Sequence, residues 1–153
     1  MKDDLTESIS QTPYAWSLAG ISETWVIGPY LRHSKTINGQ NGMLLYTSWA
    51  IDGHQNEEVV AAAYFYDEAG NELPDRDGKY ASQRGTVALV TKRVTLPYDR
   101  NLAHAYGVFM PYAQLDVTAK GRHRIFVKLR VVSSQTKQVI AESVAWPFIL
   151  KNP

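Results

Sequence analysis

The stretch VVAAAYFYDEAGNEL, residues 59–73, decides the fold class of this chain. Its first eight residues are apolar or aromatic, and residues of these kinds favour β-strands. The run stops at Gly70-Asn71, a pair typical of a tight turn, and apolar character returns at Leu73. We therefore predict a β-hairpin over this stretch.

Similar strand-and-turn units lie on both sides of this hairpin. Residues 43–51 have strand composition and follow the turn cluster Asn38-Gly39-Gln40-Asn41-Gly42, and residues 85–96 alternate with a period of two. Residues 124–131 alternate strictly between apolar and basic or aromatic side chains, which gives one core face and one basic face. Residues 140–150 supply a last strand, after a loop at 134–137. No segment of ten or more residues has helical apolar spacing, so we predict an all-β, antiparallel two-sheet β-sandwich of about eight strands.

The N-terminal part predicts a lead and an edge strand. Residues 1–19 are polar without a sustained period, and we expect a flexible lead there, followed by one β-sandwich domain over residues 20–153. The run from Ile21 to Ile37 contains Trp25 and Tyr30 and is broken by Gly28-Pro29. Because proline cannot donate a hydrogen bond within a sheet, we predict a kinked edge strand.

Composition bounds the protein class. A chain of 153 residues forms one ordinary domain, and the lack of cysteine excludes disulfides and thiolate chemistry. The first ten residues, MKDDLTESIS, lack the basic and apolar pattern of an export signal, and the apolar runs are far shorter than the roughly 20 residues of a membrane-spanning helix. We expect a cytoplasmic protein without a membrane span.

The net charge of +1 hides an asymmetry between the halves of the chain. Residues 1–78 hold 4 Lys/Arg against 12 Asp/Glu, whereas residues 79–153 hold 12 against 3. Such asymmetry can indicate a basic surface for an acidic partner. The alternative, which we favour, is that the halves interleave in one sandwich and their charges pair across strands.

Several segments together resemble a known kind of domain. In order, they are Gly42-Met43, AAYFYDEAGNEL (62–73), GKYASQRG (78–85), TLPYD (95–99) and FMPYAQL (109–115). From about Gly42 to Leu129, the chain resembles a bacterial β-sandwich accessory module, similar to C2-like or immunoglobulin-like sandwich domains. The resemblance implies a sandwich that sits beside other domains in a larger bacterial protein. It implies no activity and no functional residue.

An acidic segment offers the one constellation with a defined chemistry. Asp67, Asp75 and Asp77 are candidate metal ligands within eleven residues that also contain Glu68, Asn71 and Glu72. Calcium prefers several such oxygen ligands gathered on loops. However, Asp75-Arg76-Asp77-Gly78 lacks the remaining ligands of an EF-hand, and Asp, Asn and Gly also serve turns. Turn formation is the favoured interpretation, and calcium is the alternative.

A second constellation is the basic strand face with Arg124, Lys128 and Arg130, which is the candidate site for an acidic protein. The alternative is a solvated face, because charged residues on the wet side of an antiparallel strand also block edge pairing. The edge strand with Trp25 and Tyr30 is the other candidate, where a partner would bind by strand addition. Nucleic acid is a weaker alternative, because only Phe126 supplies a stacking aromatic between the cations.

Other chemistries have less support. Exposed aromatic side chains could stack on sugars, and the candidates are Trp25, Trp49, Trp146, Tyr64, Tyr66 and Tyr80, although strand aromatics are usually core. The four histidines, at positions 33, 54, 104 and 123, lack zinc spacing, and no Gly-x-Ser-x-Gly motif occurs. We therefore predict a non-enzymatic interaction or accessory module that binds another protein or a neighbouring domain and needs no cofactor. A calcium-dependent or carbohydrate-binding module is the alternative.

Overall fold

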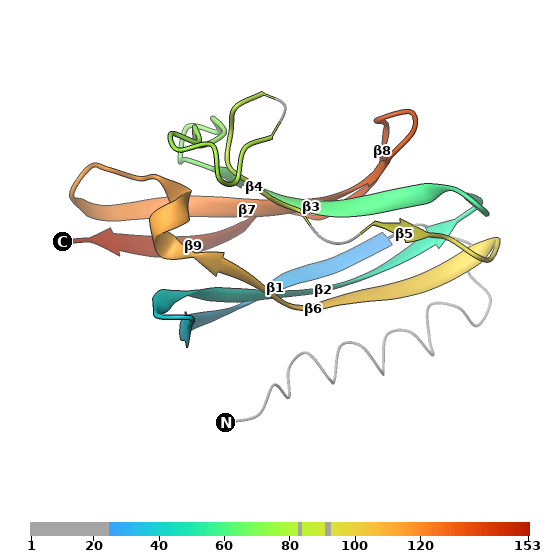
Figure 1. The fold of residues 1–153 in the computed structure, drawn as a ribbon, viewed down its shortest axis with the longest axis horizontal. Helices are drawn as coiled ribbons and strands as arrows, with labels where there is room; N and C mark the ends of the chain where they lie inside the picture. Colours follow the sequence, from blue (N-terminus) through green and yellow to red (C-terminus); the bar gives the residue numbers. More distant parts are fainter. Residues whose placement is uncertain (1–24, 83, 91–92) are drawn as a thin grey trace.

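The computed structural model describes residues 25–82, 84–90 and 93–153, and of residues 25, 27 and 103–107 it describes the backbone alone. The lead predicted for residues 1–19 lies outside this range. Two antiparallel sheets face each other and form a β-sandwich (Figure 1). The predicted fold class is thereby confirmed.

Sheet A has three strands in the order β1-β2-β6, with β1 at Trp25–Ile37, β2 at Gln40–Asp52 and β6 at Arg100–Pro111. A short 3₁₀ helix, η1 (Tyr112–Leu115), follows β6.

Sheet B is built around β3 (Glu58–Tyr66) and β7 (Gly121–Ser133), which pair with each other. The short strands β4 (Ala88–Val90) and β5 (Val94–Thr95) pair with the other edge of β3. The strands β8 (Val139–Glu142) and β9 (Trp146–Asn152) pair with the other edge of β7. The described residues thus form nine strands, because the segments 85–96 and 140–150 each contribute two short strands.

The hairpin between β1 and β2 follows from its turn residues. Asn38 and Gly39 both have positive φ, at 51° and 76°, and Ile37 pairs with Gln40. Two-residue turns with positive φ at both positions match the twist of the flanking strands, and Asn-Gly is the preferred pair. The Asn-Gly signal in the sequence therefore sets the register of sheet A.

The hairpin predicted for residues 59–73 has a short second arm. β3 ends at Tyr66, and Asp67 Oδ1 accepts hydrogen bonds from the backbone N–H groups of Ala69 and Asn71. The chain returns for one bridge, between Tyr66 and Glu72, and then enters a long loop. β4 takes the place beside β3 that the second arm would have filled.

The alternation of residues 124–131 is confirmed. Ile125, Val127, Leu129 and Val131 are at most 3% exposed and pack in the core between the sheets. Phe65 of β3 and Met43 and Met110 of sheet A are fully buried opposite them. The basic side chains of β7 therefore lie on the outer face of sheet B, away from sheet A.

The kinked edge strand is confirmed from Trp25 to Ile37, and residues 21–24 of the predicted run lie outside the described residues. β1 is at the edge of sheet A, and its pairing with β2 shifts between Ile27 and Tyr30 and again between Arg32 and Lys35. Trp146 of β9 donates its Nε1–H to the carbonyl of Gly28 at 2.8 Å, and its ring packs on Tyr30. The irregular part of β1 is thus tied to sheet B.

The opposite charges of the two halves pair in the folded chain. Three ion pairs join the acidic half to the basic half: Glu72 with Arg84, Glu58 with Arg93, and Asp52 with Arg100. The expected interleaving is therefore observed at these positions. Within the described residues, no helix has the length and apolarity needed to cross a membrane.

Candidate functional site

The outer face of sheet B consists of rows of side chains that the strand register places side by side. One end is apolar, with Val60, Val132 and Val139 in one row. The next row is Val90, Ala62, Arg130 and Glu142, followed by Ala88, Tyr64 and Lys128. Beyond these, Tyr66 pairs with Phe126, and Arg124 pairs with Ile149. Apolar, aromatic and cationic side chains therefore share one surface.

Glu142 holds two of the predicted binding residues. Arg130 Nε lies 2.6 Å from Glu142 Oε2, and Lys128 Nζ lies 3.3 Å from Glu142 Oε1. The hydrogen bond from Arg130 is the main cause that lowers the pKa of Glu142. One carboxylate thus orients two cations, and this cluster keeps a net positive charge.

Tyr64 lies between two arginines. The guanidinium carbons of Arg130 and Arg84 lie 5.2 and 5.6 Å from the centroid of its ring. Arg84 is also held by Glu72, with its Nε 3.0 Å from Oε2 and a second contact of 2.6 Å, and this bond lowers the pKa of Glu72. Cation–π contacts of this kind fix the positions of both partners.

The structure brings three of the five predicted binding residues together. Arg124, which packs over the ring of Phe126, lies on the same face as Lys128 and Arg130. Trp25 and Tyr30 lie instead on β1, in sheet A. Arg84 and Glu142 were not among the predicted site residues, and Tyr64 was predicted only as a candidate for stacking on sugars. Their roles on this face depend on cross-strand and loop contacts that no local motif encodes.

Two depressions flank Arg130 on this face. One of about 380 Å³ is floored by β3 and β7 and bounded by Ala81, Ser82 and Arg84 on one side and by Lys137 and Val139 on the other. The second, of about 310 Å³, lies between Lys128, Phe126 and the turn of residues 67–70. In Figure 1, the β3–β4 loop and the hairpin leading into β8 both rise on the side of sheet B that faces away from sheet A. The outer face is therefore grooved rather than flat.

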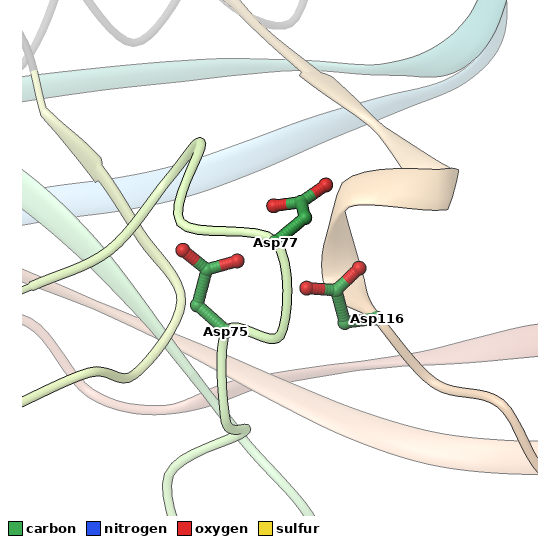
Figure 2. Close-up of side chains that lie close together, drawn as sticks. All are labelled: Asp75, Asp77 and Asp116. Atoms are coloured by element: carbon green, nitrogen blue, oxygen red, sulfur yellow. The ribbon is translucent and has the colours of Figure 1, made fainter.

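Asp75, Asp77 and Asp116 form an acidic cluster at another place (Figure 2). One carboxylate oxygen from each residue lies within 4.8 Å of the others, and this is the metal-ligand grouping found among the described residues. Each side chain also accepts a backbone N–H: Asp75 from Tyr80, Asp77 from Lys79, and Asp116 from Arg76. The other oxygen of Asp75, Oδ1, is inaccessible to solvent and has no hydrogen-bond partner.

The carboxylates of this cluster perturb one another. Burial is the main cause that raises the pKa of Asp75, and the neighbouring carboxyl groups of Asp116 and Asp77 raise it further. The backbone N–H of Lys79 is the main cause that lowers the pKa of Asp77. This pattern is that of crowded carboxylates, of which one retains its proton more strongly.

The cluster differs from the sequence-predicted set in one residue. Asp67 lies in the turn after β3, where its carboxylate caps Ala69 and Asn71. Asp116 takes its place beside Asp75 and Asp77, directly after η1 and in the left-handed conformation with φ 56°. Asp116 follows Asp77 by 39 residues in the sequence, and no local motif indicates that their carboxylates meet.

Several of the aromatic and histidine candidates make contacts within the molecule. Trp49 is 4% exposed, Trp146 binds the carbonyl of Gly28, and two guanidinium groups cover Tyr64. His33 Nδ1 lies 2.7 Å from Tyr112 Oη, at one wall of an open cleft of about 760 Å³ between the β1–β2 hairpin and β9. Burial lowers the pKa of His33 and raises that of Tyr112, so both are neutral at pH 7. This arrangement links β1 to η1.

Comparison of the chain with protein-family models and with curated proteins finds no match.

Proposed function

We propose that this chain is a non-enzymatic interaction module that binds another protein through the outer face of sheet B. The observation that carries the proposal is the grooved surface around Arg130, where Tyr64 lies between Arg130 and Arg84. Tyrosine and arginine side chains held in place by their neighbours are the residues that contribute most to protein interfaces.

The outer face is a better candidate than the edge of β1. Strand addition needs a regular row of free backbone groups, and charged residues, bulges and proline disfavour it. β1 has two register shifts, Pro29 lacks an N–H, and Tyr30 packs against Trp146. By contrast, the side chains around Arg130 are ordered by ion pairs and still border open grooves.

The resemblance of residues 42–129 to bacterial accessory modules adds to this proposal. In such an arrangement, a C2-like or immunoglobulin-like sandwich would bind a neighbouring domain or a separate protein in the bacterial cytoplasm.

The test is affinity capture with a charge-reversed surface. Arg124→Glu, Lys128→Glu and Arg130→Glu are combined with Glu142→Arg, so that ion pairs persist with reversed sign. The control is Lys35→Glu with Lys120→Glu, which changes the net charge by the same four units away from this face. We expect partners bound by the wild type and the control to be lost from the reversed variant. Partners retained by the reversed variant and lost from Tyr30→Lys would place binding at the β1 edge and contradict the proposal.

A calcium-dependent module is the second candidate, and the cluster of Asp75, Asp77 and Asp116 favours it. Each carboxylate accepts a backbone N–H through one oxygen, and Asp75 Oδ1, which is buried from solvent, accepts no hydrogen bond. Three carboxylate oxygens from two loops, completed by water, would make a weak site, with affinity in the range of about 0.1–1 mM.

Thermal unfolding tests this candidate. The chelator-stripped protein is expected to melt at a higher temperature with about 1 mM calcium, because the ion binds the folded state alone. Asp77→Asn with Asp116→Asn should abolish the increase. Asp67→Asn, in the neighbouring acidic turn, should retain it. An unchanged melting temperature for the wild type would remove calcium from consideration.

A further inference from the structure

The groove of about 380 Å³ on the outer face of sheet B has an apolar floor and apolar ends. Val60, Ala62 and Val132 contribute to the floor, and the groove runs across the strands from Val90 on β4 to Val139 on β8. Val90 and Val139, at the two ends of the groove, are 58% and 50% exposed. Exposed apolar groups gathered around a concavity mark a binding surface.

The charges of the lining are all positive. Arg84, Arg130 and Lys137 line the groove, and no carboxylate does. The carboxylates of Glu72 and Glu142, which pair with the two arginines, lie outside the lining. Lys137 forms no ion pair with any residue that the structure describes. Among the described residues, Lys137 therefore presents an unpaired positive charge to whatever enters the groove, while Arg84 and Arg130 are each held by one carboxylate outside it.

The dimensions suit a short extended segment. Adjacent strands are about 4.8 Å apart, so the path over β4, β3, β7 and β8 is about 14 Å long. An extended chain advances about 3.3 Å per residue, so about four residues cover this path. Alternate side chains of such a segment point to opposite sides, and one side can therefore face the valines while the other reaches the cations at the rim.

We propose that this groove binds an extended peptide segment in which apolar residues alternate with glutamate or aspartate. The inference deepens the proposed function, on which it rests, by giving the chemistry of the partner. The apolar side chains contact Val60, Val90 and Val139, and the carboxylates bind Lys137 and the guanidinium of Arg130. Hydrogen bonds from cations to carboxylates are roughly twice as strong as those between neutral groups.

The direct test uses three synthetic probes and amide NMR spectra of the full chain. The probes are acetyl-Val-Glu-Val-Glu-amide and its Gln and Lys counterparts. We expect the Glu peptide to shift the signals of Val90, Val132, Lys137 and Val139, with a dissociation constant roughly tenfold lower than that of the Gln peptide. The Lys peptide should not bind.

Matched variants locate the site. Val90→Asp with Val139→Asp places carboxylates at both ends of the groove and should abolish binding of the Glu peptide. Val94→Asp with Val144→Asp is the control, because these valines are 41% and 69% exposed and do not line the groove. All four positions are exposed, so the fold should tolerate each change.

The inference is wrong if the Glu and Gln peptides bind equally well, if no peptide binds, or if the Glu peptide still binds the variant Val90→Asp with Val139→Asp.

The proposed function is tested separately, by the capture experiment. If no peptide binds but capture still depends on Arg124, Lys128 and Arg130, the interaction face remains and the peptide groove does not. If capture is also independent of those cations, the proposed function is wrong.

Discussion

Two positions in this chain require glycine, one because of a close backbone contact and the other because of its backbone conformation. Gly42 is buried in β2, opposite Pro111 of β6, and its φ is not positive. A Cβ at this position would lie 2.8 Å from the Cα of Pro111 and would collide with the carbonyl of Met110. Gly39, by contrast, has open space around it and φ 76°. The two glycines are therefore needed for different reasons.

We predict that Gly42→Ala lowers the free energy of unfolding by about 2–3 kcal/mol, because the added methyl group forces β2 and β6 apart. Gly39→Asn should cost less than about 1 kcal/mol, since asparagine tolerates positive φ. Chemical denaturation measures both. A loss for Gly42→Ala no greater than that for Gly39→Asn would contradict the close approach of β2 and β6 as the constraint at Gly42.

The acidic cluster makes a prediction with a defined sign. The pKa of Asp75 is raised, so its neutral form stabilises the fold below the unfolded-state pKa near 3.9, and this contribution is lost as the pH rises through the raised pKa. In chelator at pH 7, Asp75→Asn should therefore melt at a higher temperature than the wild type, while the difference should vanish near pH 3. Melting curves at both pH values test this. A lower melting temperature of the variant at pH 7 would contradict it.

Among the elements, the short strand β9 of sheet B is linked to β1 of sheet A. Its inward residues Phe148 and Leu150 fill the core, while Trp146 reaches across to β1 of the other sheet. The bond from Trp146 Nε1 to Gly28 lies where the pairing of β1 with β2 is interrupted. β9 therefore replaces part of the hydrogen bonding that the edge strand lacks.

We predict that Trp146→Phe lowers the free energy of unfolding by about 1–2 kcal/mol, because it removes this hydrogen bond and part of the buried ring. Hydrogen exchange of the amides in β1 should rise with it. Ile149→Ala, on the exposed side of the same strand, is the control and should leave both quantities nearly unchanged. If exchange in β1 stays at the wild-type level, the link between the sheets is energetically unimportant.

At the scale of the whole molecule, three ion pairs among the described residues join the acidic half of the chain to the basic half. These ion pairs are partly exposed, with Arg93 68% and Arg84 54% accessible at the side chain. Exposed pairs contribute about 0–1 kcal/mol each, and salt screens them. The stability of the sandwich must therefore come from its apolar core.

Salt should separate stability from binding. We predict that raising NaCl from 0.05 to 1 M changes the free energy of unfolding by less than about 1 kcal/mol but weakens binding of the Glu peptide several-fold, because the Debye length falls from about 14 to 3 Å. Denaturation and peptide titration at both concentrations test this. A large loss of stability in salt would mean that ion pairs hold the sandwich together.

The sequence by itself determined the strand class, the β1–β2 turn and the faces of β7. Each of these depends on local periodicity, such as the alternation from Arg124 to Val131, or on a pair of turn residues, such as Asn38-Gly39. It also predicted the kink at Pro29, because proline has no N–H to donate to a neighbouring strand, whatever its position in a sheet.

Only the tertiary structure decided which distant groups meet. It divided residues 140–150 into two strands, placed Asp116 instead of Asp67 beside Asp75 and Asp77, and set Arg84 and Arg130 around Tyr64. The physical reason is that these contacts join residues from separate strands and loops. Their spacing in the sequence carries no period, and they arise only when the register of sheet B brings the strands side by side.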